Sequence, residues 1–379
     1  MDPPALAGRD DQIEATLAAL RAGSQAPGFC QALLGDRGVG KTVLLNEIER
    51  RCRAEMGWPV ITHQATPGGD LVASIAEKLP SAAGRSWSRV GRLVRDLDKE
   101  VTLSANLGVL RADAKMNRPT SRAQPADLLE RLLRTAGEFA AKRRSGILVT
   151  IDEAHVIERI PDLAALGAAM QLVVRRSRLP VAVILAGLPQ LRARVHGIGT
   201  FLERIDTTEI GSLGPDATRY ALIQPAAQVG VSFDAAALDI LVAASGGYPY
   251  LVQVLGYETW QAAAGAARLT AGHAQAGRAG GLGRMGALFK ARWDQLSDLE
   301  QRYIAAVARH DETPVPVAAV ATALRRTTQQ LSTTRAALIE GHRLVVSPRY
   351  GHVELALAGF GLWVRRLGDD PDRLPDTER

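Results

Sequence analysis

Residues 35–42 read Gly-Asp-Arg-Gly-Val-Gly-Lys-Thr, which fits the pattern G-x-x-x-x-G-K-T. Glycines in such a loop let backbone N–H groups close around phosphate oxygens, and the helix that follows adds the positive end of its dipole. Lys41 brings a point charge to the β- and γ-phosphates, and the Thr42 hydroxyl is a ligand for Mg²⁺. We therefore expect a nucleotide phosphate site here, with a chance glycine-rich turn as the alternative. Its residues are Gly35, Asp36, Arg37, Gly38, Val39, Gly40, Lys41 and Thr42.

A second group of polar residues, Asp152-Glu153-Ala154-His155, directly follows the apolar segment 147–151. At the end of a buried strand, the Asp152 carboxylate is placed to hold the Mg²⁺ shell, and Glu153 to orient and deprotonate the attacking water. The alternative is that these carboxylates only cap the next helix. We expect His155 to be structural or solvent-exposed rather than catalytic.

Short apolar segments bounded by Gly, Pro or charged residues must form the strands that position both motifs. They are 29–34, 59–62, 147–151 and 181–186. Helical patterns lie between them, at 43–56, 71–79, 126–142 and 164–176. Strands that alternate with helices predict an α/β fold with a parallel sheet covered on both faces. We assign this core to residues 1–212.

The strand signal stops after residue 212, and three helices are expected at 217–227, 234–244 and 250–263. They predict a helical lid over residues 213–280. The glycine-rich stretch 277–286 is predicted to be a linker. A further domain is expected at 287–367, followed by a flexible tail at 368–379.

Composition narrows the class of protein. The chain has 379 residues, of which 46% are hydrophobic, enough for two or three folded domains. Only two cysteines occur, which excludes a disulfide scaffold. The absence of an apolar run of about 18 residues argues against a membrane span. The first residues also lack an apolar signal segment, so we expect a cytoplasmic protein.

The net charge of +6 permits an anionic partner without requiring one. Residues 81–145 carry 14 Lys and Arg against 7 Asp and Glu, and 101–115 alternates like a hairpin. This segment is interpreted as a solvated insertion beside the sheet. A surface for nucleic acid or for a neighbouring subunit is the alternative.

Together the two motifs resemble those of the P-loop ATPases of the AAA+ and STAND group, over about residues 5–265. The resemblance implies ATP or ADP as the nucleotide, Mg²⁺ as the cofactor, and ATP hydrolysis as the activity. It also implies adenine contacts from Arg9, in Gly8-Arg9-Asp10, and from Pro249, in Gly246-Gly247-Tyr248-Pro249. Either segment can equally be an ordinary helix start.

Two departures from the AAA+ pattern favour slow hydrolysis. In AAA+ proteins the strand after the acidic motif usually ends in a polar side chain, the sensor, whereas here the segment 181–186 is followed by Gly-Leu-Pro. Gln190 is a candidate substitute for that side chain. No sensor arginine follows the lid proline closely. The resemblance further implies a homo-oligomer in which an arginine acts on the neighbour's nucleotide, and Arg204 is the best-placed candidate. An ordinary surface arginine at a helix end is the alternative.

The C-terminal part begins with a capping box, Ser297 to Glu300, and continues as helices at 300–309, 317–324 and 328–340. A hairpin of 344–347 and 353–357 follows, so the pattern resembles a winged helix-turn-helix. Residues 281–368 carry 12 basic and 7 acidic side chains. If this domain binds double-stranded DNA, the third helix enters the major groove. The expected contacts are Arg325, Arg326, Thr328, Gln329, Ser332, Arg335 and Arg349.

Two functions fit this order of core, lid and winged helix. The first is an AAA+-like ATPase that couples its nucleotide state to oligomer assembly and DNA binding, a layout that resembles the origin-recognition initiators. The second is a STAND-like slow ATP/ADP switch whose winged helix docks a protein partner. A small-molecule kinase is disfavoured, because no motif for an acceptor pocket is visible.

Overall fold

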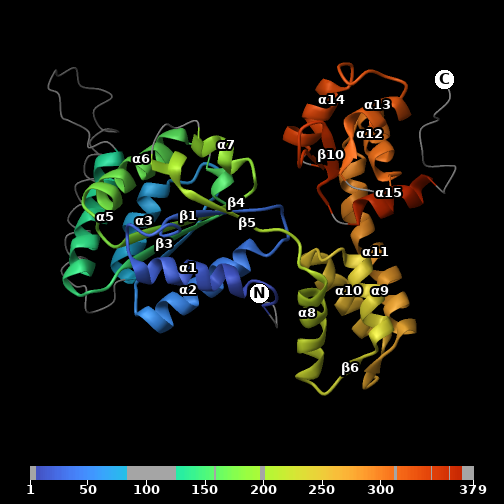
Figure 1. Cartoon of the computed structure of the whole chain (residues 1–379), viewed down its shortest axis with the longest axis horizontal. Coiled ribbons are helices and arrows are strands. Elements are labelled where there is room, and N and C mark those ends of the chain that lie inside the picture. The colour runs from blue at the N-terminus through green and yellow to red at the C-terminus, as the bar shows by residue number, and fades with distance from the viewer. Residues whose placement is uncertain are drawn as a thin grey trace, which may run out of the picture. The chain divides into compact units, whose positions relative to one another are not determined.

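The computed structural model describes residues 6–82, 125–157, 159–196, 201–310, 314–342, 344–357 and 359–368. The chain divides into two compact units, Met1–Gly211 and Ser212–Arg379. We describe each by itself (Figure 1). The predicted hairpin at 101–115 and the tail from residue 369 lie outside the described residues.

The first unit contains a five-stranded, wholly parallel sheet in the order β2-β3-β4-β1-β5. The strands are β1 Gln31–Leu34, β2 Val60–Gln64, β3 Ile147–Asp152, β4 Val181–Gly187 and β5 Asp206–Glu209. Every residue of β1, β3 and β4 is buried, as expected for central strands covered on both faces. The predicted α/β fold is therefore confirmed.

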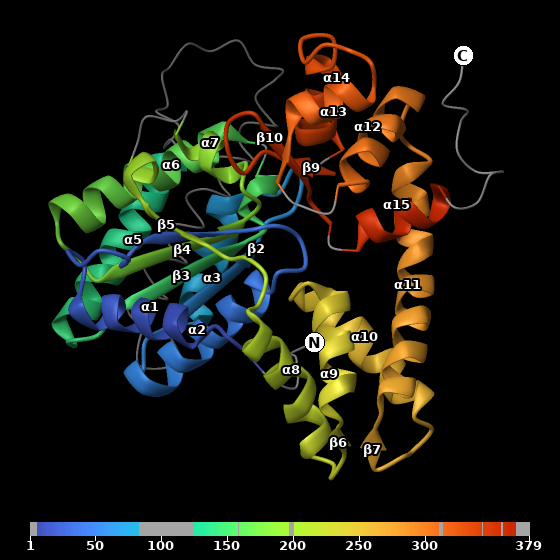
Figure 2. The same cartoon turned by 45° about the vertical axis from the view of Figure 1, so that its right-hand side comes forward.

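Helices cover the two faces of this sheet. The main ones are α1 Asp10–Ala22, α2 Lys41–Met56, α3 Leu71–Ala82, α5 Pro125–Lys142, α6 Ile160–Met170 and α7 Leu191–His196. Short helical turns are η2 Ala154–Val156, η3 Gln171–Arg176 and η4 Phe201–Arg204. Helices α1 and α2 lie on one side of the sheet, and α6 and α7 on the other (Figures 1 and 2).

The second unit begins with four helices: α8 Pro215–Ala227, α9 Ala235–Ser245, α10 Pro249–Ala262 and α11 Ala271–Trp293. Two short strands, β6 Ser232–Phe233 and β7 Arg268–Leu269, pair beside them. The remaining elements are α12 Asp298–Ala308, β8 Val315–Pro316, α13 Val317–Ala323, α14 Ser332–Ala336, η5 Ala337–Gly341, β9 Val345–Val346, β10 His352–Leu355 and α15 Phe360–Gly368. Strand β10 pairs antiparallel with both β8 and β9.

The glycine-rich stretch 277–286 is not a linker, and that prediction is wrong. It lies inside α11, which starts at a capping box between Thr270 and His273. A Cβ at Gly277 would overlap Thr259 Oγ1 and would lie 2.5 Å from the backbone nitrogen of that residue in α10. A Cβ at Gly281 would lie 2.7 Å from Leu255. The glycines therefore let α10 and α11 pack closely.

A pair of substitutions in α11 separates packing from helix propensity. We expect Gly277→Ala to destabilise the protein by about 1–3 kcal/mol, because the added methyl group has no room against Thr259. Gly283 is exposed, and a Cβ added there would meet no atom within 4 Å, so Gly283→Ala should stabilise the protein by up to about 1 kcal/mol. Thermal unfolding measures both. A higher melting temperature for both variants would contradict the packing role.

The third helix of the C-terminal part also differs from its predicted range of 328–340. Thr327 and Gln330 close a turn, in which each backbone N–H donates to the other residue's side-chain oxygen. The α-helix that follows this turn starts at Ser332. The capping box from Ser297 to Glu300 is present as predicted.

Candidate functional site

Both predicted motifs lie at the carboxyl edge of the sheet. Strand β1 leads into the loop 35–40, and β3 ends at Asp152. The loop is fixed between two neighbouring strands, because Gly35 N–H donates to the Gly187 carbonyl (3.2 Å) and Ile210 N–H donates to the Leu34 carbonyl (2.6 Å). Parallel pairing of β1 with β4 and β5 thus places the loop directly at the sheet edge.

Three glycines of the loop are required by its geometry. A Cβ at Gly35 would overlap the carbonyl oxygen of Ile210. Gly38 has φ 79° and Gly40 has φ 92°, in the left-handed region that favours glycine. Gly40 is also the N-cap of α2, so backbone N–H groups at the start of that helix are presented at the loop.

Lys41 is held across this loop. Its Nζ donates hydrogen bonds to the carbonyl oxygens of Gly35 (2.8 Å) and Asp36 (2.7 Å), and only 6% of the residue is exposed. Burial lowers the pKa of Lys41 from its ordinary value, while the nearby Glu153 and Asp152 carboxylates act in the opposite direction. Burial also raises the pKa of Asp36. The ammonium is therefore positioned before any phosphate binds.

The two predicted metal ligands meet across the motifs. Thr42 Oγ1 donates to Asp152 Oδ2 at 2.7 Å, although the residues are 110 positions apart. A hydroxyl and a carboxylate oxygen are the hard donors that Mg²⁺ prefers, with phosphates and water completing its shell. Among the described residues, no group of three or more His, Cys, Asp and Glu side chains forms a separate metal site. The Thr42 hydroxyl and the Asp152 carboxylate therefore fit Mg²⁺.

Glu153 lies beside this pair. Its backbone N–H donates to Asp152 Oδ1 (2.8 Å), and its φ of 52° is unusual for a residue with a side chain. The Glu153 side chain is 34% exposed, so water can reach it. His155 was expected to be structural or exposed; it is buried, and its Nδ1 lies 3.3 Å from Glu153 Oε2. Sequence reasoning missed this contact.

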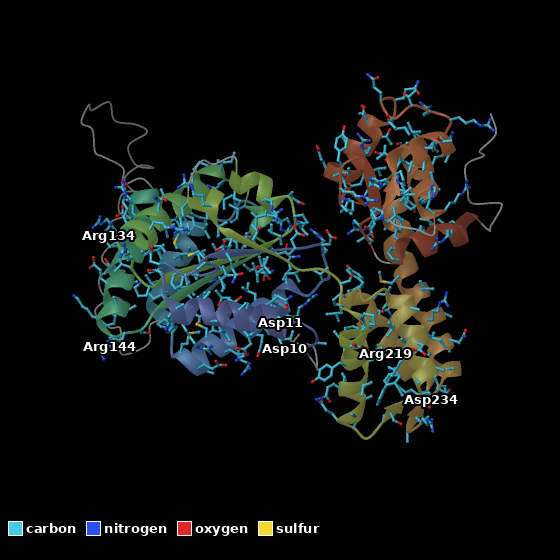
Figure 3. The ribbon with its side chains drawn as sticks, in the orientation of Figure 1. Asp10, Asp11, Arg134, Arg144, Arg219 and Asp234 are labelled. Atoms are coloured by element: carbon cyan, nitrogen blue, oxygen red, sulfur yellow. The ribbon has the colours of Figure 1, made fainter. Side chains whose placement is uncertain are left out.

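Arg9 is the residue before α1, whose first residues Asp10 and Asp11 are labelled in Figure 3. Its guanidinium is buried and donates to the carbonyls of Val39 (3.1 Å) and Gly211. Burial lowers its pKa. Arg9 therefore joins the phosphate loop to the end of the first unit, and its predicted adenine contact stays a prediction.

Arg9→Ala should lower the stability of the first unit. Removal of the guanidinium leaves the Val39 carbonyl without this buried donor, at a cost of about 1–3 kcal/mol. Thermal unfolding and ATP titration measure the effect, with Arg21→Ala as the control, because Arg21 pairs with Glu55 at the surface. An unchanged melting temperature in Arg9→Ala would show that these bonds are not stabilising.

Two further residues support the site without a signal in the sequence. The Glu49 carboxylate in α2 accepts a hydrogen bond from Thr150 Oγ1 in β3 (2.6 Å), so it joins the elements that carry Thr42 and Asp152. Arg194 in α7 donates to the carbonyls of His155 and of Ile157, the latter at 3.0 Å. Both contacts join segments far apart in the chain, which no local pattern reveals.

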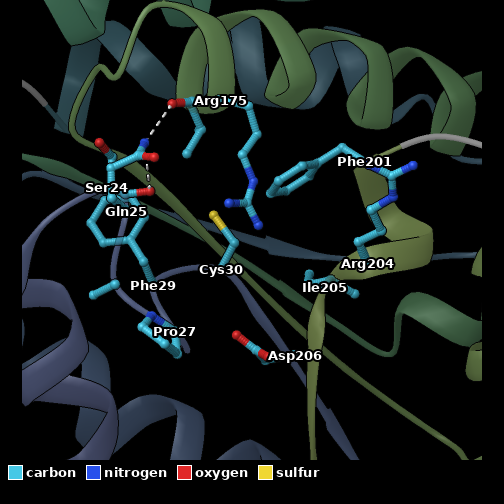
Figure 4. A pocket seen from close by; sticks show the side chains of 12 residues that line it. Ser24, Gln25, Pro27, Phe29, Cys30, Arg175, Phe201, Arg204, Ile205 and Asp206 are labelled. Atoms are coloured by element: carbon cyan, nitrogen blue, oxygen red, sulfur yellow. Dashed lines mark hydrogen bonds between the residues drawn. The ribbon is translucent and has the colours of Figure 1, made fainter.

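Arg204 is exposed and lies near the amino ends of the strands, because it stands two residues before the start of β5. It lines a hollow of about 190 Å³ together with Arg175, Phe201 and Asp206 (Figure 4). The Arg175 guanidinium lies over the Phe201 ring, 5.4 Å from its centroid. The phosphate loop follows the other ends of these strands, so Arg204 does not serve its own loop.

The remaining predicted residues belong to the second unit. Pro249 opens α10 after Gly246 and Gly247, which both have positive φ. The predicted DNA contacts Arg325, Arg326, Thr328, Gln329, Ser332 and Arg349 are exposed, and Arg335 is half-buried. Their roles stay predictions.

Comparison with protein families gives two matches. Residues 5–184 match the AAA ATPase domain family, and residues 286–364 match a domain of unknown function (DUF8462). Comparison with curated protein sequences gave no match. Among the described residues, no helix is long and apolar enough to cross a membrane.

Solved structures with a similar fold include a Walker-type ATPase of Pyrococcus abyssi. It is 15% identical with a TM-score of 0.61, over 95% of this chain and 96% of that one. Cdc6p of Pyrobaculum aerophilum is 14% identical with a TM-score of 0.46, over 98% and 96%. The Aeropyrum pernix ORC1 protein in complex with DNA is 15% identical with a TM-score of 0.43, over 98% and 94%. By the family match over residues 5–184, the first unit of the chain is similar to AAA ATPase domains.

Proposed function

We propose that this protein is a Mg²⁺-dependent ATPase that couples its nucleotide state to homo-oligomer assembly and to DNA binding. The observation that carries the proposal is the meeting of Thr42 and Asp152 at 2.7 Å, with Glu153 beside them and Lys41 over the loop. Thr42 and Asp152 would hold Mg²⁺, which supplies charge neutralisation at the phosphates. ATP and water would give ADP and phosphate.

The residues divide the chemistry between them. Lys41 and the loop N–H groups bind the β- and γ-phosphates. Glu153, partly exposed at the sheet edge, orients the attacking water and accepts its proton. We expect turnover to be slow, because β4 ends in Gly187 without a polar side chain at the site.

Arg204 supports assembly in a head-to-tail arrangement. At the amino edge of the sheet it can serve only the nucleotide of a second copy, and such an arginine stabilises charge in the transition state. Mixing two variants tests this. Lys41→Ala keeps Arg204 but cannot hold phosphate, and Arg204→Ala keeps the loop.

We expect each variant alone to hydrolyse ATP slowly and the mixture to recover activity, because intact sites then meet intact arginines. Arg178→Ala, at an exposed position in the same unit, is the control and should keep wild-type turnover. Wild-type turnover by Arg204→Ala at every protein concentration would exclude the arginine from catalysis.

The element order of the C-terminal part supports a winged helix used on DNA. Helix α12, strand β8, helices α13 and α14 and the hairpin β9–β10 follow the order of such domains, and the turn before α14 exposes Arg325 and Arg326. Binding of labelled duplex DNA tests it. Arg325→Ala with Arg326→Ala should weaken binding and flatten its salt dependence by about one log–log unit per lost phosphate contact.

A STAND-like switch with a protein partner is the second candidate. The Gly-Gly-Tyr-Pro segment supports it, because it resembles a motif of the STAND-type ATPases. A Cβ at Gly247 would overlap the Leu213 carbonyl, and the Gly247 carbonyl accepts a hydrogen bond from Leu213 N–H (2.8 Å). The Gly-Gly-Tyr-Pro segment is thereby joined to the first residues of the second unit. No binding of duplex DNA at low salt, with slow turnover independent of protein concentration, would favour this candidate.

A further inference from the structure

The turn that follows Glu153 places a buried histidine beside the Glu153 carboxylate. Its η2 segment carries His155, whose side chain is 1% exposed and whose Nδ1 lies 3.3 Å from Glu153 Oε2. The partner carboxylate is itself 34% exposed. A buried imidazole thus contacts the group that would accept the proton from water.

Two neighbouring elements fix this turn. Arg194 from α7 donates to the carbonyls of His155 and Ile157, on either side of the end of the turn. The end of β4 contributes Gly187, where a Cβ would lie 3.3 Å from the backbone nitrogen of His155 and 2.8 Å from Leu191. A side chain at Gly187 would therefore require the Leu191 side chain to move. The imidazole enters the site from the turn instead.

We infer that His155 is a positioning residue that holds the Glu153 carboxylate through Nδ1 in the orientation that accepts a proton from water. The inference rests on the proposed ATPase function. Imidazole can donate from Nδ1 to a carboxylate in its neutral form, and this contact leaves the second Glu153 oxygen for water. Arg194 and Gly187 fix the backbone from which His155 reaches Glu153.

Substitution of His155 separates this role from a structural one. His155→Leu retains an apolar volume without a donor, whereas His155→Asn places an N–H donor close to the position of Nδ1. We expect His155→Leu to lower kcat by about 10- to 100-fold with KM and ATP affinity within about twofold, because only the geometry of the base changes. His155→Asn should recover most of kcat.

A second buried histidine is the matched control. His63 in β2 is also buried, and its ring bonds Ser74 Oγ (2.7 Å). His63→Leu should lower the melting temperature without changing kcat. In a Glu153→Gln background, His155→Leu should have no further effect on turnover, because the two residues act as one unit.

The outcomes separate the inference from the function on which it rests. Equal kcat for wild type and His155→Leu overturns the inference and leaves the ATPase function intact. If His155→Leu does not fold, the turnover of His155→Asn compared with that of His155→Gln decides whether the inference holds. Gln reaches toward Nε2, so equal activity of His155→Asn and His155→Gln also overturns it. A wild-type protein that releases no phosphate contradicts the ATPase function, and the inference with it.

Discussion

Lys41→Ala is expected to weaken ATP binding by about 100-fold or more. The Lys41 ammonium is already positioned by the carbonyls of Gly35 and Asp36, so it can turn to a phosphate without being ordered first. Two charge-assisted hydrogen bonds to phosphate, at about 1.5 kcal/mol or more each, correspond to a loss of about two orders of magnitude in affinity. Calorimetric titration with a non-hydrolysable ATP analogue measures it.

Lys41→Arg is the control for charge. A guanidinium retains the positive charge but is planar and larger, so it does not reproduce the compact ammonium between the two carbonyls. We expect intermediate affinity. An affinity of Lys41→Ala equal to that of the wild type would show that the loop is not the phosphate site.

Glu153→Gln is expected to leave ATP binding intact and to lower turnover by about 100- to 10,000-fold. The amide is nearly isosteric with the carboxylate but cannot accept the proton of the attacking water, and general base catalysis contributes about this much. Neither of these two hydrogen bonds to the Asp152 carboxylate involves the Glu153 side chain, so the metal ligands should remain in place. Phosphate release and ATP titration on the same sample separate the two effects.

Asp152→Asn, unlike Glu153→Gln, is expected to impair metal binding as well as turnover. Loss of this carboxylate charge removes a Mg²⁺ ligand, so turnover should fall together with the apparent affinity for Mg²⁺. If Glu153→Gln kept wild-type turnover, another residue would have to act as the base.

The sheet and both motifs could be predicted from sequence because their signals are local. Strands β1 to β4 lie at the four predicted apolar runs, whereas the edge strand β5 is polar and mostly exposed. The phosphate loop follows from the spacing of Gly35, Gly40 and Lys41. A parallel sheet then brings Thr42 and Asp152 to the same edge without further information.

The errors occurred where tertiary contacts override local preference. Glycines in 277–286 favour a linker by propensity, but Gly277 is required by the close approach of α10 at Thr259. Contact between Arg194 and the turn at His155 spans 39 positions, so no periodicity reveals it. The contacts of Arg9 leave no local pattern either, because its two carbonyl acceptors lie 30 and 202 positions away in the sequence.

ATP hydrolysis by the purified protein, with Mg²⁺, across a protein concentration series and with or without duplex DNA, tests the central proposal most directly. We predict Mg²⁺-dependent phosphate release that rises per subunit with protein concentration and with DNA, and that Glu153→Gln abolishes. Phosphate release that persists undiminished in Glu153→Gln, or none from the wild type at any concentration, would contradict the proposal.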